Sequence, residues 1–431
     1  MNRPKPAQRV LCAMLAGAMN RGYSAAMPPR DPPAVMSAPA LLPTLAEAIR
    51  RIAHEAIPLG AEHVPLAAAG GRMLVAPVRA RTDFPRRDAA AMDGFALARA
   101  DAENGLRWRI VAGPIAADRR LASGEAVRIA TGATLPEGAE RIVPIERATV
   151  AGTWVSCAEP DGRPHIRLRG SDFRVGDITL AAGRRIDPRA LVAAAAADVE
   201  TVAVRRVARV GVMVRGDLLV APGLAAERDG AIPDSLGGAL ALLTAGCGAQ
   251  AGGAVRIGED PAALVTAVDA MRGGVDVIVL AGGAAHGARD AAQQALRPLG
   301  LDLIFDGLAI RPGRPSWYGR IGSAHVLGLP GNPTAAMTLA RLLLAPLIGH
   351  LGGDPAAAML AWEMLPLIAP VPANGARESF LCAAAEAGGV RLLDRRDGSG
   401  EMMLAAADRL VVRPAHGDAL SAGTMVPTLR F

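Results

Sequence analysis

The chain has 431 residues, of which 51% are hydrophobic, 20% charged and 3% aromatic, and its formal net charge is +6 at pH 7. This composition is globular, and the length predicts roughly two to four domains. The few aromatic residues argue against a stacking platform for single-stranded nucleic acid, and the arginines form no dense basic tract. A positive chain does favour anionic small molecules, because its summed potential concentrates anions near the surface.

The cysteines and the N-terminal segment indicate the cellular setting. Cys12, Cys157, Cys247 and Cys382 lie far apart, and none has the spacing of a zinc site. We therefore expect reduced thiols in a cytoplasmic protein. Residues 1–40 join a short apolar run to a proline-rich stretch, which we interpret as a disordered leader rather than an export signal. No uncharged apolar run long enough to span a membrane follows.

The first predicted element is a helix over residues 44–57, with Thr44 in the N-cap position and apolar residues at helical spacing. Between residues 64 and 204, short apolar runs are broken by glycine, proline and aspartate, which predicts β-rich modules. One helix is predicted within this region at residues 187–199, where Asp187 caps and a proline fills the first helical position.

After residue 206, strand patterns alternate with helical patterns. Strands are predicted at 207–214, 275–283 and 326–329, and helices at 234–249, 261–274, 289–300 and 333–348. This alternation predicts a parallel, doubly wound sheet over residues 207–351, whose ligands bind beyond the carboxyl ends of the strands. The turns RGDLL, AGGAAHGARD and GLPGNP all fall at that edge. Residues 355–431 return to short β runs and predict a small terminal barrel or sheet.

Two of the later turns can hold an anion. In AGGAAHGARD, Gly282 and Gly283 let the backbone approach a ligand, although a plain turn between a strand and a helix has the same composition. The spacing matches neither GxxxxGK[ST] nor GxGxxG, which excludes those two nucleotide-binding fingerprints. In RPGRP, Arg311 and Arg314 stand on a turn stiffened by prolines and can grip a phosphate, or they form a solvated basic turn.

Two earlier motifs carry polar side chains beside glycine. In DAAAMDGFAL, Asp93 can hold a divalent cation or transfer a proton, whereas an Asp–Gly pair is also ordinary turn chemistry. In RIATGATLPEGAERI, the hydroxyl of Thr131 and the backbone after it can bind an oxyanion, or the segment is a plain loop.

Taken together, these motifs resemble those of a known family. AMDGFA, RIATGATLPEGAERIV, RPGRP and GLPGNPTAAM identify the chain, from about residue 41 to its C-terminus, as similar to the molybdopterin molybdenumtransferases, the group of MoeA and the gephyrin E domain. The segments RLRGSDFRVGDITLAAGRRIDPRAL and GDLLVAPG fall where that family has comparable segments. The combination of GLPGNP with TGAxxPxGA makes the resemblance specific.

The resemblance implies a multidomain fold that combines α/β and β-rich parts. A first domain of residues 41–84 and 161–206 surrounds an inserted β-rich domain of residues 85–160. A doubly wound, MoaB-like molybdopterin-binding domain follows at 207–351, and a C-terminal β-barrel at 355–431. Family members are homodimers, and their cleft lies between the doubly wound domain of one subunit and the β-rich domain of the other.

The resemblance also implies an activity in molybdenum cofactor biosynthesis. Family members bind adenylylated molybdopterin and, with Mg²⁺ and molybdate, break its phosphoanhydride, release AMP and leave the metal on the dithiolene. The implied catalytic residues are Asp93, Thr131, Asp260 and Asp290, of which the three aspartates serve the metal ion. The implied substrate-binding residues are Gly282, Gly283, Arg311, Arg314, Pro330, Asn332 and Pro333. The expected partners are an anionic pterin, a second copy of the chain, and molybdoenzymes or other cofactor-biosynthesis proteins, with no nucleic acid and no membrane.

The chain departs from the family pattern at several polar positions. Leu218 replaces the glutamate of GDEL, Ala281 and Ala285 replace hydroxyl residues, and Ala89 and Ala90 replace Asn and Ser. We expect these losses to fall in the polar lining of one cleft. The sequence therefore allows an enzyme that completes the cofactor, a divergent paralogue that binds molybdopterin or a related precursor as a carrier or scaffold, or a related reaction on another anion.

Overall fold

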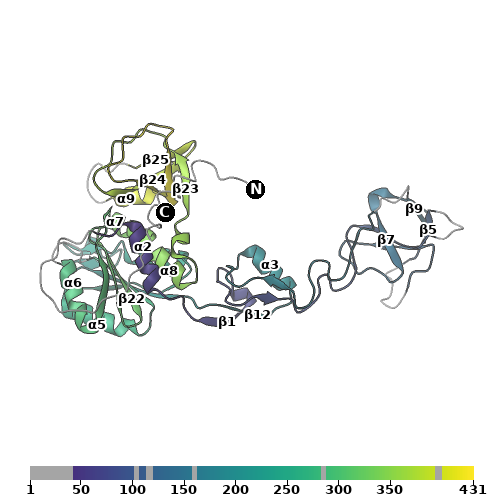
Figure 1. The fold of residues 1–431 in the computed structure, drawn as a ribbon, viewed down its shortest axis with the longest axis horizontal. Helices are drawn as coiled ribbons and strands as arrows, with labels where there is room; N and C mark the ends of the chain where they lie inside the picture. Colours follow the sequence, from purple (N-terminus) through teal and green to yellow (C-terminus); the bar gives the residue numbers. More distant parts are fainter. Residues whose placement is uncertain (1–41, 101–105, 113–119, 158–162, 283–287, 394–399) are drawn as a thin grey trace, which may run out of the picture. The chain divides into compact units, whose positions relative to one another are not determined.

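The computed structural model describes residues 42–100, 106–112, 120–157, 163–282, 288–393 and 400–431 (Figure 1). The chain divides into two compact units, one formed by Met1–Leu59 with Arg206–Phe431 and the other by Gly60–Arg205.

A seven-stranded mixed sheet is the centre of the larger unit. Its strands are β16 (Gln250–Ala251), β17 (Val255–Ile257), β13 (Arg209–Arg215), β18 (Val277–Ala281), β22 (Ala324–Leu329), β21 (Trp317–Ile321) and β19 (Leu301–Asp306). The neighbours of β13 and the pair β18–β22 are parallel, as predicted. The prediction of an all-parallel sheet is wrong for β21 and β19, which add antiparallel strands at one side because a tight turn joins β21 to β22.

Helices cover both faces of this sheet, so it is doubly wound (Figure 1). The helices are α4 (Gly237–Gly246), α5 (Pro261–Arg272), α6 (Ala288–Leu296), α7 (Pro333–Leu339) and α8 (Ala345–Leu351). Alternate residues of β18 point to opposite faces: Val277 and Val279 pack in the cluster that includes α4 and α7, whereas Ile278 and Leu280 pack with α5 and α6. Short 3-10 turns, η3 (Ala225–Glu227), η4 (Arg297–Leu299) and η6 (Ala356–Met359), and the two-stranded ribbon β14 (Leu219–Val220) with β15 (Ile232–Pro233) complete the layer.

Helices α7 and α8 are joined by a π-helical segment, η5 (Ala340–Leu344), into one run from Pro333 to Leu351. The π turn lies just before Pro346, which lacks the N–H that a regular helix would use there. By length and composition this 19-residue run could cross a membrane, but 72% of its most apolar window is buried inside the protein. It is therefore the central core helix of the larger unit.

The N-terminal helix α2 (Leu45–Glu55) begins where the sequence predicts, and the Thr44 hydroxyl accepts the N–H of Glu47. Its buried face packs in the same core cluster as α8. Residues 42–59, which the sequence assigns to a first domain of residues 41–84 and 161–206, group here with the larger unit. Compositional cues along the chain could not show which distant helix would cover this apolar face. The predicted domain boundaries stay predictions.

A six-stranded β structure completes the larger unit. Its strands are β20 (Ile310–Arg311), β24 (Glu378–Glu386), β26 (Arg409–Arg413), β27 (Met425–Arg430), β23 (Trp362–Pro366) and β25 (Gly389–Leu392), with the short helix α9 (Glu401–Ala406) beside β24. A bridge between Leu367 and Val390 joins the end of β23 to β25 and closes the structure around its own apolar cluster. Strand β20 comes from the RPGRP segment, so Arg311 is built into this structure rather than standing on a free turn.

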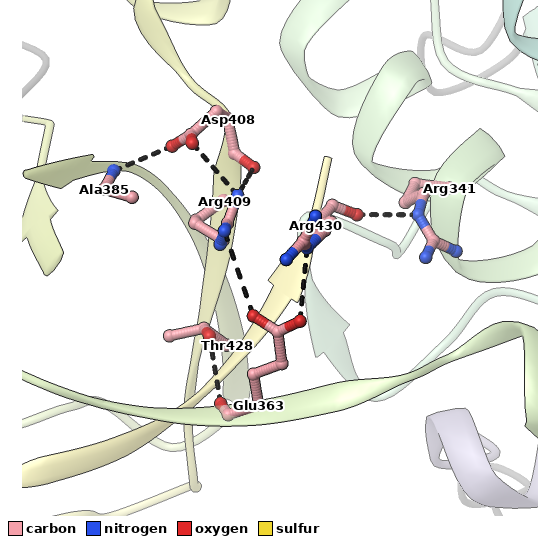
Figure 2. Close-up of polar contacts among 7 residues, drawn as sticks. All are labelled: Arg341, Glu363, Ala385, Asp408, Arg409, Thr428 and Arg430. Atoms are coloured by element: carbon pink, nitrogen blue, oxygen red, sulfur yellow. Dashed lines mark hydrogen bonds and ion pairs between the residues drawn. The ribbon is translucent and has the colours of Figure 1, made fainter. Parts of the chain in front are cut away.

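Polar contacts fasten the terminal strands together and to the core helix (Figure 2). The carboxylate of Glu363 accepts Nε of Arg430 at 3.1 Å and lies 3.8 Å from the guanidinium of Arg409. Nε of Arg341, on the π-helical segment, donates to the carbonyl oxygen of Arg430 at 2.8 Å. The terminal β structure is thus held against the helix whose first turns follow the GLPGNP motif.

The smaller unit is mostly β-structure. Its largest sheet orders β7 (Ala139–Pro144), β4 (Gly94–Ala98), β6 (Glu125–Ile129), β5 (Arg107–Ile110), β9 (Trp154–Cys157) and β8 (Ala148–Ala151). Three strand pairs accompany it: β1 (Ala61–Pro65) with β12 (Thr201–Arg205), β2 (Val78–Arg79) with β11 (Ile178–Leu180), and β3 (Ala89–Ala90) with β10 (Ile166–Arg167). Helix α3 (Pro188–Ala196) begins at Asp187, whose carboxylate accepts the N–H of Ala190, as the sequence predicts. The 3-10 turns are η1 (Leu66–Ala68) and η2 (Ile145–Arg147).

Candidate functional site

The carboxyl ends of three parallel strands meet in the larger unit, where the sequence places its anion-binding turns. Val214 of β13 pairs with Ala281 of β18, which pairs with Leu329 of β22. The next residue, Gly282, donates its N–H to the carbonyl oxygen of Leu329 at 3.2 Å. The glycine-rich turn and the GLPGNP turn are therefore adjacent, as expected for one edge of a parallel sheet.

Glycine is required at position 282 by both conformation and space. Its φ is +93°, and a Cβ there would lie 2.5 Å from the carbonyl oxygen of Arg215. A Cβ at Gly331 would lie 3.3 Å from Cα of Gly282. The two predicted turns thus approach each other through bare backbone. A Cβ at Gly331 would press on Gly282, and a Cβ at Gly282 would press on Arg215 of the neighbouring strand. Gly283 lies outside the described residues.

Arg215, at the end of β13, is a buried charge that sequence reasoning missed. It is 5% exposed, and Nη2 donates to the carbonyl oxygen of Glu259 at 2.9 Å. Its Nε and Nη1 meet no hydrogen-bond partner among the described residues. Burial lowers the pKa of the guanidinium, while the nearby Glu259 and Asp217 oppose that shift. The only sequence signal is an arginine that ends an otherwise apolar strand.

Asp217 and Asp260 organise the backbone around the start of α5. Asp217 accepts the N–H of Glu259 at 2.8 Å. Asp260, predicted as a catalytic and metal-binding residue, is the N-cap of α5 and accepts the N–H groups of Ala262 and Ala263 at 3.2 Å each. In this arrangement the Asp260 carboxylate already serves a structural purpose, namely starting the helix.

The GLPGNP turn is set by its end residues. Pro330 is buried directly after β22, and Pro333 is the first residue of α7. Between them, Asn332 caps the helix, because Oδ1 accepts the N–H of Ala335 at 3.1 Å. Asn332, implied as a substrate-binding residue, therefore also starts the helix that follows the turn.

A cleft of about 880 Å³ lies beside this turn, between the start of α7 and the terminal β structure. Its polar lining includes Arg311, Asn332, Thr334, Thr338 and Arg391. Its apolar lining includes Pro370, Val371, Pro372, Phe380, Leu381, Leu392, Leu393 and Met403. A concave site with apolar walls and a few polar groups is the usual form of a small-molecule site.

The two predicted arginines differ in their relation to this cleft. Arg311 is exposed and lines it, so the structure brings Arg311 and Asn332 to one site. Arg314 is exposed but is not among the lining residues, and neither are Pro330 and Pro333. Of the two arginines predicted to grip a phosphate together, Arg311 lines the cleft and Arg314 does not.

In the smaller unit, Asp93 and Thr131 form the tightest contact between two sequence motifs. Oδ1 of Asp93 accepts the N–H of Thr131 at 2.6 Å and the Thr131 hydroxyl at 2.8 Å. The backbone N–H, followed by the hydroxyl, lowers the pKa of Asp93. Because both Thr131 donors are used, Thr131 has no donor left for an oxyanion while Asp93 holds it. This geometry favours Asp93 as the residue that positions the TGA loop.

Backbone hydrogen bonds join the same two motifs along their length. The N–H of Ala90 donates to the carbonyl oxygen of Ala133 at 2.9 Å, and Gly132 donates to the carbonyl oxygen of Ala90 at 2.8 Å. The side chain of Ala90 is 1% exposed and packs in an apolar cluster. These hydrogen bonds and an isolated bridge between Ala89 and Thr134 hold the two motifs together, independently of the side chains at these positions.

An arginine-rich pocket of about 640 Å³ lies beside Ala89 and the TGA loop and was missed by sequence reasoning. Its charged lining consists of Arg81, Arg86, Arg87, Arg169 and Asp83, and Ala89, Gly132 and Thr134 also line it. Asp83 accepts Nε of Arg169 at 2.6 Å and the N–H of Val175 at 2.9 Å. Four guanidiniums against one carboxylate make the pocket electropositive. The available signal was the run RTDFPRR, which places three arginines within residues 81–87.

The substituted family positions do not share one environment. Ala281 is fully buried in the core of the larger unit, and Leu218 is 56% exposed. The expectation that the losses fall in a polar cleft lining is therefore wrong for Ala281 and Ala90, whose side chains face apolar neighbours. Ala89 does line the arginine-rich pocket. Ala285 lies outside the described residues.

The predicted metal ligands do not assemble within either unit. Across the described ranges, no three His, Cys, Asp or Glu side chains are placed to hold a metal ion together. Asp93 belongs to the unit of residues 60–205 and Asp260 to the other, and each already accepts backbone N–H groups. Asp290 lies in α6, and its side chain is outside the described part. The described side chains of Asp93 and Asp260 therefore form no preassembled Mg²⁺ site within either unit, since such a site needs several oxygen ligands around one point.

Two stretches of the chain match known protein families. Residues 43–197 match the family described as "MoeA N-terminal region (domain I and II)". Residues 211–350 match the family described as "Probable molybdopterin binding domain". The boundary between the two matches falls close to Arg206, where the smaller unit ends.

Relatives that match about two thirds of the chain agree with these family matches. A molybdopterin molybdenumtransferase of Synechococcus elongatus is 31% identical over 306 residues, 68% of this chain and 76% of the relative. One of Nostoc sp. is 30% identical over 304 residues, 68% of this chain and 70% of the relative. The crystal structure of a molybdopterin biosynthesis MoeA protein from Pyrococcus horikosii, 26% identical, covers 90% of this chain and 99% of its own with a TM-score of 0.72. The chain belongs to the molybdopterin molybdenumtransferase family.

Proposed function

We propose that the protein completes molybdenum cofactor by inserting molybdenum into adenylylated molybdopterin. In this reaction molybdate is the metal source, the phosphoanhydride bond breaks, AMP leaves, and the metal stays on the dithiolene of the pterin. Family membership supports this proposal, because the relatives compared above are named as transferases and not as carriers. The geometric observation that carries it is the cleft that joins Arg311 and the GLPGNP turn to an apolar wall.

The residues of the larger unit would bind and orient the substrate. Arg311 presents a guanidinium to the phosphate groups, and guanidiniums bind phosphate oxygens in bidentate fashion. Gly282 and Gly331 let the glycine-rich turn and the GLPGNP turn lie against each other at the sheet edge, which fixes the GLPGNP side of the cleft. The apolar wall would cover the faces of a planar ring and exclude water from them.

The residues of the smaller unit would supply electropositive surroundings. Asp93 fixes the TGA loop through Thr131, and this loop borders the pocket that carries Arg81, Arg86 and Arg87. An electropositive pocket raises the local concentration of an anion such as molybdate. A homodimer and a cytoplasmic location are proposed on the family resemblance, as are protein partners in cofactor biosynthesis and magnesium dependence. Because the described carboxylates do not fit a preassembled site, no step is assigned to the magnesium ion.

The test is a defined reaction with the purified full chain. Adenylylated molybdopterin, molybdate and magnesium are supplied, and AMP is measured by chromatography. AMP release that rises with molybdate and saturates supports the proposal. A chain that binds the nucleotide but releases no AMP across a wide molybdate range would be a carrier, and the proposal would fail. Light scattering on the same sample tests the dimer.

A further inference from the structure

Two threonine hydroxyls of the cleft beside Asn332 are buried without a hydrogen-bond partner. Thr334 and Thr338 stand one turn apart on α7, and both line the cleft. Their Oγ1 atoms are inaccessible to water and meet no donor or acceptor within the described part of the chain. Thr338 is only 1% exposed. Since a buried hydroxyl without a partner costs free energy, this pair calls for a partner from outside the protein.

Another buried threonine in a helix of the same unit shows how such a hydroxyl ordinarily forms its hydrogen bond. Thr244, fully buried in α4, donates its hydroxyl to the carbonyl oxygen of Leu240 at 2.7 Å, four residues earlier. Thr338 has an equivalent carbonyl four residues earlier, at Thr334, and makes no such bond. A carbonyl acceptor is thus present in the helix, yet the Thr338 hydroxyl does not bond it.

The rest of the cleft indicates the chemistry of the missing partner. Each hydroxyl offers one donor and two acceptor lone pairs, so a pair of them suits a ligand edge that carries both donors and acceptors. An oxyanion offers acceptors only and would leave the lone pairs of both hydroxyls unused. The apolar residues around the pair, such as Phe380 and Leu392, suit the faces of a flat ring. Arg311, exposed at the same cleft, suits a negative substituent.

A flexible side chain stands beside the first hydroxyl. A Cβ at Gly400 would lie 2.9 Å from Cε of Met403 and 3.1 Å from Oγ1 of Thr334, so these two atoms share one small space. Methionine is unbranched and adapts easily to a changed neighbour. Met403 also lines the cleft, so a ligand that enters the cleft can displace this side chain.

We propose that Thr334 and Thr338 determine specificity by hydrogen-bonding the edge of a fused heteroaromatic ring that occupies this cleft, while Arg311 binds its anionic substituent. The inference rests on the proposed function, whose substrate contains two such rings, a pterin and an adenine. Both rings present ring nitrogens and an amino group at one edge, which is the shared chemistry. The experiment therefore separates them with two probes.

The test is calorimetric titration of the full chain with pterin-6-carboxylate and, separately, with AMP. Thr338→Val and Thr334→Val keep the shape of the side chain and remove the hydroxyl. Each change is expected to weaken binding of one probe about fivefold to tenfold, the usual value of one hydrogen bond. Thr338→Ser is expected to restore most of the affinity. Thr244→Val, a matched buried helical threonine outside the cleft, is expected to leave both affinities unchanged.

Thermal unfolding of the free proteins gives a second readout. Thr338→Val removes no hydrogen bond of the protein, so its melting temperature is expected to equal or exceed that of the parent chain. Thr244→Val breaks a buried bond and is expected to melt lower. Loss of pterin affinity would place the pterin in the cleft, and loss of AMP affinity the adenine.

Three results would overturn the inference: parent-like affinity of both valine variants for both probes, no binding of either probe to the parent chain, or a Thr338→Val protein destabilised as much as Thr244→Val. The titrations contain no molybdate and require no turnover. The titrations would therefore still test the role of the two threonines even if the chain released no AMP in the transfer reaction.

Discussion

Thr131 gives both its backbone N–H and its hydroxyl to a single carboxylate oxygen of Asp93, at 2.6 and 2.8 Å. This contact ties the TGA loop to the AMDG motif, in addition to the backbone hydrogen bond that Ala90 donates to Ala133. It also consumes both donors of Thr131. The geometry of the loop therefore depends on Asp93, whose carboxylate fixes the position of Thr131.

Replacing Asp93 should release the loop. Asp93→Ala removes the acceptor of both Thr131 donors, and we expect molybdenum insertion to slow by about 10²–10³-fold, as for other preorganised polar groups. The measurement is the rate of AMP release at saturating substrate. Asp187→Ala is the matched control, because Asp187 also accepts a backbone N–H in the smaller unit, as the cap of α3. Equal rates for the two variants would exclude a positioning role for Asp93.

Gly282 provides a test of the close approach at the sheet edge. Gly282→Ala places a Cβ against the carbonyl oxygen of Arg215 in a left-handed backbone conformation, so we expect a loss of roughly 3 kcal/mol or more in the free energy of unfolding. Gly300 has a similar φ, +83°, with open space around it. Gly300→Ala should therefore cost only the conformational strain, about 1–2 kcal/mol.

Urea unfolding of both glycine variants supplies these values. The difference between them isolates the steric clash with Arg215. Similar losses at the two positions would show that the edge can widen at no cost.

The buried pair Tyr318–His325 should make stability depend on pH. The tyrosine hydroxyl lies 2.8 Å from Nδ1 of His325, and burial lowers the pKa of this histidine from 6.5 to about 4. Between pH 6.5 and 4, His325 is therefore protonated in the unfolded chain but remains neutral in the folded chain. The resulting stability is complete above pH 6.5 and is lost as the pH falls towards 4, by about 3 kcal/mol.

This pH dependence can be assigned with one variant. His325→Gln should be less stable at neutral pH, yet its free energy of unfolding should change less between pH 6.5 and 4 than that of the parent chain. Unfolding by urea at several pH values within this window measures the change. Parallel curves for the two proteins would assign the pH dependence to other groups.

Leu218 tests whether a lost carboxylate limits activity. It follows Gly216 and Asp217 beyond β13, and its side chain is 56% exposed, so Leu218→Glu should leave stability within about 0.5 kcal/mol. If the family glutamate is the missing group, AMP release should rise in this variant. Leu242→Glu, at a 75% exposed leucine of α4, controls for the added charge. No gain from Leu218→Glu would indicate that the surroundings of this position have changed with it.

Local signals in the sequence predict local structure well. Thr44 and Asp187 cap their helices as expected, and Asn332 caps α7 within a turn that two prolines already define. Each of these features depends on residues within four positions of one another. The parallel strands were equally readable, because strands buried on both faces are continuously apolar.

Non-local features could not be read in the same way. The packing of α2 depends on an apolar face of α8 nearly three hundred residues away in the chain, and no local pattern names that partner. The antiparallel pairing of β19 with β21 and of β21 with β22 depends on how these segments fold back on one another, which the composition of each segment does not show.

The candidate site shows the same division. The motif residues Gly282, Asn332 and Arg311 could be named from the sequence, whereas the burial of Arg215 and the unpaired hydroxyl of Thr338 could not. Both depend on which distant segments cover them. A threonine in a helix has the same local sequence whether its hydroxyl bonds the helix or faces a cleft.

The central claim is most directly tested by the ratio of molybdenum retained on the pterin to AMP released in a single turnover. Full chain in excess over adenylylated molybdopterin is mixed with molybdate and magnesium, and both products are quantified after separation. The proposed function predicts one metal atom bound for each AMP released. AMP release without metal on the pterin, or a stable nucleotide complex with neither product, would contradict it.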